Sequence, residues 1–416
     1  MERIENMPSI LSINNYHYRR GGADAMFLEH DRMFRELGWS TAVYSMQHPN
    51  NEPSDWSPYF VDELEFGNSY SPSRKLLMAT KVIYSLEARH RLLQLLEKFH
   101  PDIAHVHSVY HHISPSILPL LRERGIPIVL TAHDLKLACP AYKMLNAKGI
   151  CEKCRGGNLL HVVLNKCVRD SLVTSGLVAL ESVAHRVTGI YKNNLSAIIT
   201  PSLFYSSKLR EWGWPEQQLR YIPNYIDSSL YKTSKTVGSY FLYFGRLAAE
   251  KGIATLIQAA QKADVPLRII GTGPEEARLK SLALSTGGSV EFLGYRSGPE
   301  LLAIIQSARA VVLPSEWYEN APMTILESYA LGKPVLGANI GGIPEMILSG
   351  ETGFLFESGN CEQLSHLLTN VAKMTDGVLL EMGREARRLV EQRFTPDRYR
   401  EEMLALYDSV RCGKPR

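Results

Sequence analysis

Two glutamates, Glu319 and Glu327, are separated by seven residues in a part of the chain where apolar runs alternate with polar loops. Glu319 follows an apolar run at 310–313, and Glu327 falls within an amphipathic stretch from about 322 to 331. Ionised carboxylates only accept hydrogen bonds, and each offers two oxygens, so one could hold sugar hydroxyls and the other a ribose diol. The alternative is that both are solvated surface charges, and the pattern alone favours neither interpretation.

Groups suited to a diphosphate accompany these carboxylates. Free backbone amides at the start of a helix bind anions. The residues at the start of this predicted helix are Asn320, Ala321, Pro322, Met323 and Thr324. Arg246 and Lys251 follow another apolar run at 239–244, and an Arg with a Lys can form a phosphate clamp. Gly271 marks a further strand-to-helix turn. Taken singly, the two cations could also belong to surface ion pairs.

The first half of the chain adds two candidate contacts. Gly22 stands where a predicted strand at 9–15 turns into a helix, and glycine lets a backbone approach a ligand, although it serves any tight turn. His133 follows the predicted strand 126–131, and carboxyl ends of strands are where open α/β sheets bind ligands. A lone histidine is more often structural, but its position beside an acid at a strand end favours a functional role.

Four of the six cysteines lie close together, with the spacing C-x11-C-x2-C-x12-C. They are Cys139, Cys151, Cys154 and Cys167. A CxxC pair with two further thiols fits a tetrahedral four-thiolate zinc site that fastens an irregular loop. The alternative is a set of reduced structural thiols.

Predicted strands and helices alternate through nearly the whole chain. The expected strands are 9–15, 40–45, 102–107, 126–131 and 196–200 in a first array, and 239–244, 266–271, 290–294, 310–313 and 334–338 in a second. This alternation predicts an α/β fold with two parallel sheets, each covered by helices on both faces. A Pro- and Asn-containing stretch at 221–227 is the expected connection between them.

Composition excludes several classes of protein. A hydrophobic content of 45% with 21% charged residues is typical of a globular protein, and 416 residues predict two domains. A net charge of +3 gives no argument for a nucleic-acid partner. Neither a signal peptide nor a run of ~18 apolar residues is found, so we expect a cytoplasmic protein. A predicted helix at 74–99 has a basic first half, which could lie on a membrane surface, although core packing is the simpler interpretation.

Together the motifs resemble the retaining glycosyltransferases of family four. In the family's order they are GGAD, HD before CP, IPNYID, FGRLAAEKG, GTGPE, the Glu319–Glu327 pair, GGIPE and ETGFLF. The resemblance implies a GT-B fold, in which two Rossmann-like doubly wound domains face each other across a cleft. It implies an acceptor-side domain of residues 1–203, with a Cys-rich insertion at 139–170, completed by a C-terminal helix at 396–416. Residues 204–395 would form the donor-binding domain.

The resemblance also implies roles for the donor-side residues. Arg246 and Lys251 would bind the donor diphosphate, Glu319 the sugar hydroxyls, and Glu327 the ribose. The segment containing Tyr295 would line the base pocket, and the amides near 321–324 would help to hold sugar and phosphate.

On the acceptor side, Gly22 would lie under the diphosphate and His133 beside the reacting sugar. Asn-Ala-Pro at 320–322 replaces the Pro-Phe-Gly of many members, so the identity of the sugar stays open.

The expected activity is transfer of a sugar, with retention, from a UDP- or GDP-sugar to a glycan or lipid-linked acceptor. Surface polysaccharide or glycolipid biosynthesis at the inner membrane face would be the setting. Because no DxD triplet is present to chelate a metal-bound diphosphate, we expect no catalytic metal. Two alternatives are a sugar-nucleotide epimerase of the same fold and a non-catalytic carbohydrate-binding scaffold.

Overall fold

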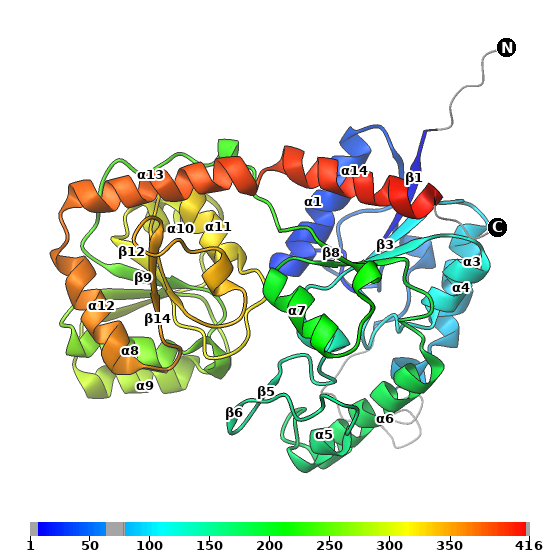
Figure 1. Ribbon diagram of the computed structural model, residues 1–416, viewed down its shortest axis with the longest axis horizontal. Coiled ribbons are helices and arrows are strands. Elements are labelled where there is room, and N and C mark those ends of the chain that lie inside the picture. The colour runs from blue at the N-terminus through cyan, green and yellow to red at the C-terminus, as the bar shows by residue number, and fades with distance from the viewer. Residues whose placement is uncertain (1–6, 64–77, 79, 413–416) are drawn as a thin grey trace. The chain divides into compact units, whose positions relative to one another are not determined.

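The computed structural model describes residues 7–63, 78 and 80–412. The chain divides into two compact units (Figure 1). The first contains residues 1–201, 205–222 and 400–416, and the second contains residues 202–204 and 223–399.

A six-stranded parallel sheet forms the centre of the first unit. Its strands are β1 (Ser9–Asn14), β2 (Ser40–Tyr44), β3 (Ile103–Ser108), β4 (Ile128–Thr131), β7 (Ala197–Thr200) and β8 (Leu219–Tyr221). Their order is β2-β1-β3-β4-β7-β8, so the direction of chain progression reverses between β1 and β3. The helices of this unit are α1 (Gly22–Glu36), α3 (Leu86–Leu96), α4 (Ile117–Glu123), α5 (Leu160–Leu164), α6 (Leu172–Thr188), most of α7 (Leu203–Glu211) and most of α14 (Pro396–Cys412).

The boundary between the units differs from the expected one at residue 203. Strand β8 pairs in parallel with β7, which carries residues 205–222 into the first unit. The sequence analysis did not include β8, because a strand of three residues leaves too short a pattern.

The second unit contains another six-stranded parallel sheet, in the order β11-β10-β9-β12-β13-β14. Its strands are β9 (Phe241–Phe244), β10 (Leu267–Ile270), β11 (Val290–Gly294), β12 (Ala310–Leu313), β13 (Val335–Ala338) and β14 (Gly353–Phe356). The direction of progression reverses between β9 and β12, and ligands of such sheets bind at this kind of reversal.

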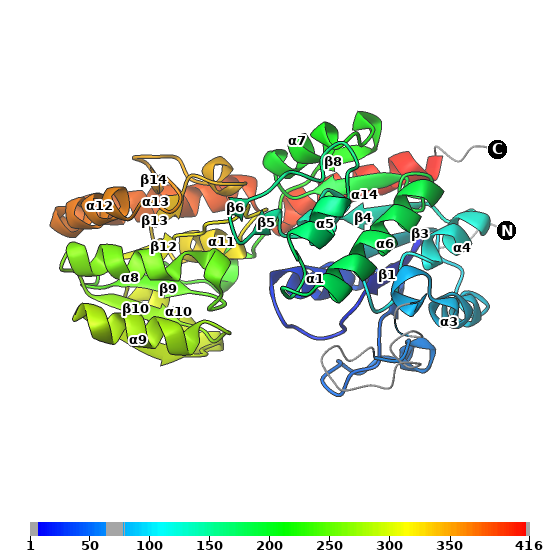
Figure 2. The same ribbon diagram turned by 90° about the horizontal axis from the view of Figure 1, so that it is seen from below.

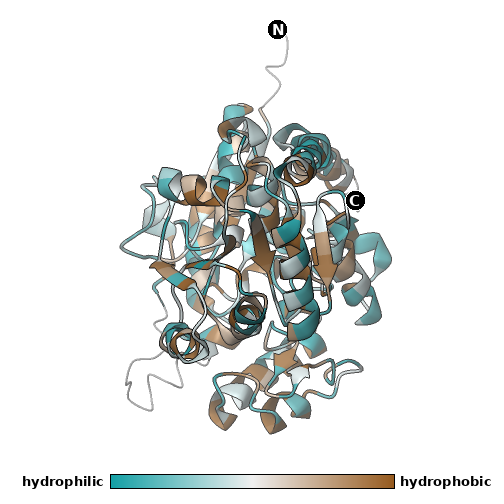
Figure 3. Ribbon diagram, turned by 90° about the vertical axis from the view of Figure 1, so that its left-hand side faces the viewer, coloured by the Kyte–Doolittle hydropathy of each residue, from teal (hydrophilic) through white to brown (hydrophobic). Residues whose placement is uncertain are grey.

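Alternate residues of each strand in the second sheet face opposite helical layers. Phe241 and Tyr243 pack in one core with α8 (Ile253–Lys262), α9 (Glu276–Thr286) and α12 (Cys361–Lys373). Leu242 and Phe244 pack in the other core with α10 (Gly298–Gln306), α11 (Met323–Ala330) and α13 (Asp376–Arg393). Figure 3 shows brown, hydrophobic strands between helices that carry teal, hydrophilic stretches. Burial on both faces explains why the strands are short apolar runs.

The predicted helix at 74–99 is only partly observed. Residues 74–77 and 79 lie outside the described residues. Helix α3 begins at Leu86 because the side chain of Ser85, in an extended conformation, accepts a hydrogen bond from the Ala88 amide and caps the helix. Lys81, part of the predicted basic face, forms an ion pair with Glu87.

The segment between β4 and α6 contains little regular structure. A hairpin of two-residue strands, β5 (Leu145–Asn146) and β6 (Gly149–Ile150), precedes α5. Figure 2 shows α5 beside α6. Helix α6 is capped by Ser171 at its start and ends at Gly189, whose left-handed conformation suits glycine. Across the described part of the chain, no helix is both long enough and apolar enough to span a bilayer.

Candidate active site

The reversal point of the second sheet brings together two loops that are distant in sequence. Strands β9 and β12 are direct neighbours, with Ala310 opposite Phe241. The loop after β9 contains Arg246 and Lys251, and the loop after β12 contains Glu319. Because both strands are parallel, both loops leave the same edge of the sheet. The sheet topology therefore concentrates candidate ligand-binding side chains at one place.

An ion pair joins the two loops. Lys251 Nζ lies 2.7 Å from Glu319 Oε1, and the carboxylate residue is only 6% exposed. Ser315 Oγ donates a second hydrogen bond to the same oxygen at 2.6 Å. Two donors on one oxygen fix the orientation of the carboxylate, so Glu319 is held in place before any ligand arrives.

Trp317 also borders this pair. The Lys251 ammonium lies 5.0 Å from the centre of the indole ring. The indole Nε1 is buried and has no hydrogen-bond partner among the described residues. It is therefore a donor whose hydrogen-bonding capacity is unused by the described residues. Sequence reasoning missed Ser315 and Trp317, because neither residue type carries a motif and only the loop conformation turns them towards Lys251 and Glu319.

Glycines allow the loops at this edge to pack against one another. A Cβ atom on Gly252, whose φ is +65°, would lie 1.9 Å from the carbonyl oxygen of Pro314. A Cβ atom on Gly271, whose φ is +131°, would lie 1.9 Å from the carbonyl oxygen of Gly245. Both positions require glycine for backbone packing. The structure thus gives Gly271 a role in supporting the loop that carries Arg246.

The loop that carries Glu319 is supported from its other side by Gly341 and Gly342. The Gly342 amide donates to the Glu319 carbonyl oxygen at 2.8 Å, and a Cβ atom on Gly341 would lie 2.3 Å from that oxygen. Asn320 Oδ1 accepts from Ser202 Oγ at 2.6 Å. Close contacts with residues distant in sequence thus hold the Glu319 loop in place.

The start of helix α11 follows directly. Asn224 Nδ2 donates to the Ala321 carbonyl oxygen at 3.1 Å. Pro322 occupies the N-cap position, where no side chain caps the helix, and Met323 and Thr324 form the first turn. Amides in this turn point away from the helix, and such amides attract anions.

Three further predicted residues belong to the second unit. Arg246 follows β9 and is exposed, with its carbonyl oxygen accepting a hydrogen bond from the Tyr243 hydroxyl at 2.9 Å. Tyr295 follows β11 and is 68% exposed. Glu327 lies in the middle of α11 and is half-buried. Among the predicted donor-side residues, Lys251 and Glu319 are thus in direct contact.

In the first unit, His133 follows β4 and belongs to a buried array of imidazoles. His133 Nε2 lies 3.0 Å from His107 Nδ1, and the two rings are stacked. His107 in turn stacks on His105, with ring centres 4.3 Å apart. Sequence analysis singled out only His133. The alternation of His105 and His107 along β3 places both on one face of the sheet, which is a signal that could have been used.

The array continues to the C-terminal helix. Tyr407 Oη, on α14, lies 2.5 Å from His105 Nδ1 and 2.9 Å from His30 Nε2. The other nitrogen of His105 lies 2.7 Å from Thr131 Oγ1. His30, His105 and His107 have nitrogen atoms within 4.8 Å of one another, the spacing of a metal site. Because both His105 nitrogens already have protein partners, a hydrogen-bonded array accounts for this cluster without a metal.

Burial keeps these imidazoles neutral. It lowers the pKa of His133 to about 4 and that of His30 to about 3, and it lowers the pKa of His105 and His107 well below the usual value. Next to His133, burial raises the pKa of Asp134 to about 6, although the carboxylate accepts a hydrogen bond from the Lys136 amide. A neutral His133 can donate or accept a hydrogen bond without adding a positive charge.

Gly22 is the first residue of α1, at the reversal point of the first sheet. It is exposed, and the preceding Gly21 has an extended backbone and provides no side-chain cap. Asp24 in the first turn is buried and accepts a hydrogen bond from Asn14 Nδ2 at 3.0 Å. Burial raises the pKa of Asp24. The amides at the start of α1 are therefore next to an exposed, side-chain-free backbone that a ligand can approach.

Two parallel six-stranded sheets, each with a reversal of strand order, are the architecture of the GT-B class of glycosyltransferase folds, as predicted from the sequence. The family model described as Glycosyltransferase Family 4 matches residues 20–230, and the model described as Glycosyl transferases group 1 matches residues 232–389. The chain belongs to glycosyltransferase family 4.

Curated relatives agree with this membership. A glycogen synthase of Mycobacterium tuberculosis (strain H37Rv) is 29% identical over 239 residues, which cover 55% of this chain and 56% of the relative. The D-rhamnosyltransferase WbpZ of Pseudomonas aeruginosa is 32% identical over 38% of this chain and 42% of the relative. The sulfoquinovosyl transferase SQD2 of Arabidopsis thaliana is 25% identical over 68% of this chain and 52% of the relative. The chain thus spans about half the length of the curated relatives it matches.

Solved structures share the fold over nearly the whole chain. A sucrose-phosphate synthase from Thermosynechococcus elongatus matches with a TM-score of 0.72 and 19% identity, over 97% of this chain and 99% of that one. Alr3699/HepE from Anabaena, in complex with UDP and glucose, matches with a TM-score of 0.67 and 18% identity, over 97% and 100%. At such identities the likeness concerns the fold.

Proposed function

We propose that this protein transfers a sugar, with retention of anomeric configuration and without a catalytic metal, from a nucleotide-diphosphate donor to a glycan or lipid-linked acceptor. The observation that carries the proposal is the Lys251–Glu319 ion pair at the reversal point of the second sheet, in a chain of glycosyltransferase family 4. Surface polysaccharide or glycolipid assembly is the setting that we infer, because one relative is named as a putative colanic acid biosynthesis glycosyltransferase, WcaL, and one solved structure of this fold as a lipopolysaccharide outer core galactosyltransferase, WaaB.

The second unit would bind the donor, and the first would bind the acceptor. Lys251 and the exposed Arg246 would take up the negative charge of the diphosphate, together with the amides at 321–324. Glu319, already oriented by Ser315, would accept hydrogen bonds from sugar hydroxyls. Relatives of this fold bound to UDP or UDP-glucose support a UDP-sugar as donor, with a GDP-sugar as the alternative.

The remaining residues would complete the donor site. Glu327 would bind the ribose diol, and Tyr295 would lie against the base. The exposed backbone at Gly22 would approach the diphosphate, and Gly271 would support the loop of Arg246. His133 would contact the reacting sugar, where a neutral imidazole does not repel a cationic transition state.

Sugar transfer would depend on positive charges placed beside the leaving diphosphate. The bond between the anomeric carbon and the diphosphate oxygen lengthens towards an oxocarbenium-like state, and the clamp stabilises the charge that develops on the leaving diphosphate. The acceptor hydroxyl attacks from the same face, and its proton passes to a donor phosphate oxygen. Glu319 would act by orienting the sugar.

A nucleotide-sugar panel tests the proposal. Binding and slow hydrolysis of UDP- and GDP-sugars are measured for the wild-type protein and for Lys251→Ala. We expect one donor class to bind and to be hydrolysed, and the variant to lose both properties. Conversion of the donor to its epimer in the absence of an acceptor would instead support the epimerase, and binding of glycan without any nucleotide would support the scaffold.

We also propose that the protein acts in the cytoplasm, at the inner surface of a membrane. Helix α6 exposes Val173, Leu180 and Val187, which are 81%, 58% and 82% exposed and follow one another at intervals of seven residues, so that they form one stripe. Lys166 and Arg186 nearby are exposed as well. An apolar stripe with basic neighbours suits an anionic lipid surface.

Vesicle flotation tests the membrane contact. Vesicles that contain phosphatidylglycerol should bind the wild-type protein, and the double variant Val173→Asp, Val187→Asp should reduce binding at least about fivefold, because it removes the most exposed apolar groups. Leu284→Asp is the matched control, since Leu284 is 84% exposed on α9 of the second unit. Equal binding of the double variant and the control would contradict this proposal.

A further inference from the structure

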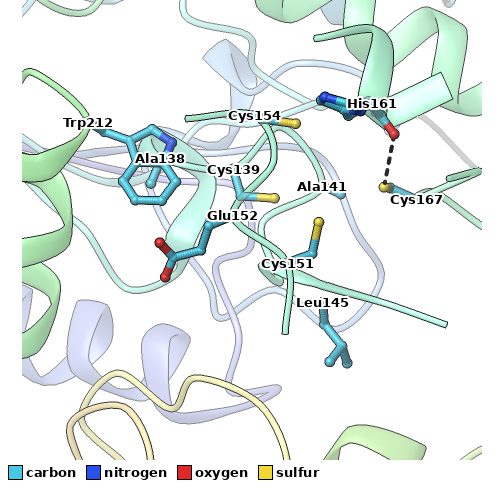
Figure 4. A pocket seen from close by; sticks show the side chains of 11 residues that line it. Ala138, Cys139, Ala141, Leu145, Cys151, Glu152, Cys154, His161, Cys167 and Trp212 are labelled. Carbon is cyan, nitrogen blue, oxygen red and sulfur yellow. Dashed lines mark hydrogen bonds between the residues drawn. The ribbon is translucent and has the colours of Figure 1, made fainter. Parts of the chain in front are cut away.

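Four cysteines from separate parts of the segment 139–167 line one small cavity of the first unit (Figure 4). Cys139 follows the 3₁₀ turn Leu135–Leu137, Cys151 follows β6, Cys154 lies in the next turn, and Cys167 follows α5. Figure 4 shows their sulfur atoms turned towards a common space. The cavity has a volume of about 10 Å³, which is room for one small guest.

The segment has few other means of holding its shape. Its regular structure is limited to two strands of two residues and a helix of five. Five of the eight non-glycine residues with positive φ in the described part of the chain lie here, and that conformation is costly for residues with a side chain. They are Tyr142, Met144, Lys166, Arg169 and Asp170. The local apolar core consists of little more than Leu159, Val162 and Ala179 around the cysteines.

The four thiols line one cavity, but no three of their sulfur atoms, all of which the structure describes, lie within 4.8 Å of one another, so a bound ion would have to draw them closer. None of the four is in a disulfide.

Glu152, the carboxylate that lines the same cavity, already has a partner. It forms an ion pair of 2.9 Å with Lys208. The four thiols are the soft donors of this lining, and the imidazole of His161, which also lines the cavity, is a further nitrogen donor. The positive charge of Arg186 lies near Cys154 and would offset part of the negative charge of a four-thiolate complex.

We propose that Cys139, Cys151, Cys154 and Cys167 bind one zinc ion as four thiolates, and that the ion holds the separate parts of segment 139–170 together. Binding of Zn²⁺ to four thiols releases four protons and leaves a complex with a charge of −2. Because a four-thiolate site is closed, with no open position for a substrate, the role of the ion is structural. The site is independent of the proposed donor site.

Metal analysis of the full-length protein tests this proposal. Protein expressed with added zinc and purified with a reductant should contain one zinc per chain by mass spectrometry, and cobalt-substituted protein should show the visible absorption of a tetrahedral thiolate site. Cys151→Ser should lose the zinc. The matched control, Cys361→Ser with Cys412→Ser, removes two cysteines outside the cluster and should retain it.

Thiol titration of the wild-type protein covers the case in which Cys151→Ser does not fold. In the native protein two of the six thiols should react with a disulfide reagent, and a mercurial should release one zinc as the other four react. Stoichiometric iron, a disulfide between two of the four residues, or six reactive thiols in native protein with substoichiometric zinc would each overturn the proposal.

Discussion

Lys251 and Glu319 form an ion pair of 2.7 Å although 68 positions separate them in the sequence. The pair exists because β9 and β12 are neighbours and their loops leave the same edge of the sheet. Each partner satisfies the other's charge in the structure without a ligand. A donor that brings both a diphosphate and sugar hydroxyls can replace or share these contacts, so the two groups are arranged in advance for such a ligand.

The pair gives the first prediction. Lys251→Ala should lower kcat/KM for sugar transfer by roughly 10²-fold or more, which is the scale of losing one group that stabilises developing charge. Arg246→Ala should have a similar effect. Lys262→Ala is the matched control, because Lys262 forms an exposed ion pair with Glu362 in the same unit. The turnover of this variant should stay normal. Near-normal turnover of Lys251→Ala and Arg246→Ala would refute the diphosphate clamp.

Ser315 should matter through the orientation of Glu319. Ser315→Ala removes the 2.6 Å hydrogen bond to the carboxylate, and the loss of one charge-assisted hydrogen bond corresponds to roughly a tenfold decrease in kcat/KM. Ser315→Thr, which keeps a hydroxyl, should restore part of the activity. Ser285→Ala, which removes an exposed hydroxyl on α9, serves as the control in steady-state assays. Identical kinetics for Ser315→Ala and Ser285→Ala would show that Ser315 does not position Glu319.

We expect position 271 to require glycine for two reasons, its positive φ and the close packing of its backbone against Gly245. Gly271→Ala, at a φ of +131°, places a Cβ atom 1.9 Å from the Gly245 carbonyl oxygen, whereas Gly287→Ala, at a φ of +75°, meets nothing within 4 Å. We expect Gly287→Ala to cost about 1 kcal/mol of unfolding free energy and Gly271→Ala to cost at least twice as much. Chemical denaturation of both variants measures the difference. Equal losses would mean that the strained φ accounts for the whole effect.

The buried imidazoles predict a loss of stability in mild acid. The folded pKa of His30 is about 3 and that of His133 about 4, both below the unfolded value of 6.5. The unfolded chain therefore binds more protons, so the contribution is complete above about pH 6.5 and is lost as the pH falls towards 4. Each such proton contributes about 1.4 kcal/mol per pH unit below the unfolded pKa.

Urea unfolding at a series of pH values between 7 and 5 measures this dependence. His30→Gln keeps a hydrogen-bond donor and an acceptor for Tyr407 and His105. This variant should reduce the slope of the unfolding free energy against pH by the amount that corresponds to about one proton. His366→Gln, at an exposed site on α12, should leave it unchanged. A wild-type stability that does not change over this range would contradict the neutral array.

The local sequence pattern was sufficient to predict the strands and the polar residues that follow them. Short apolar runs marked the ten expected strands, and the polar residues shortly after them, such as Arg246 and His133, marked the carboxyl ends of the strands. This succeeds because burial on both faces dictates composition locally, and the carboxyl end of a parallel strand is defined by the strand itself. The family motifs lie in these same loops.

The partners of these residues depended on the tertiary structure. His105 and Tyr407 are 302 positions apart, and no local pattern connects a tyrosine of the last helix to a strand near the start of the chain. Ser315 and Trp317 became part of the site only through the conformation of one loop. The positions of the strands and of their ends can be predicted locally, because burial dictates which residue types a strand contains. Which of the residues at these ends meet is decided by strand order and loop packing, and these depend on contacts between residues that are distant in sequence.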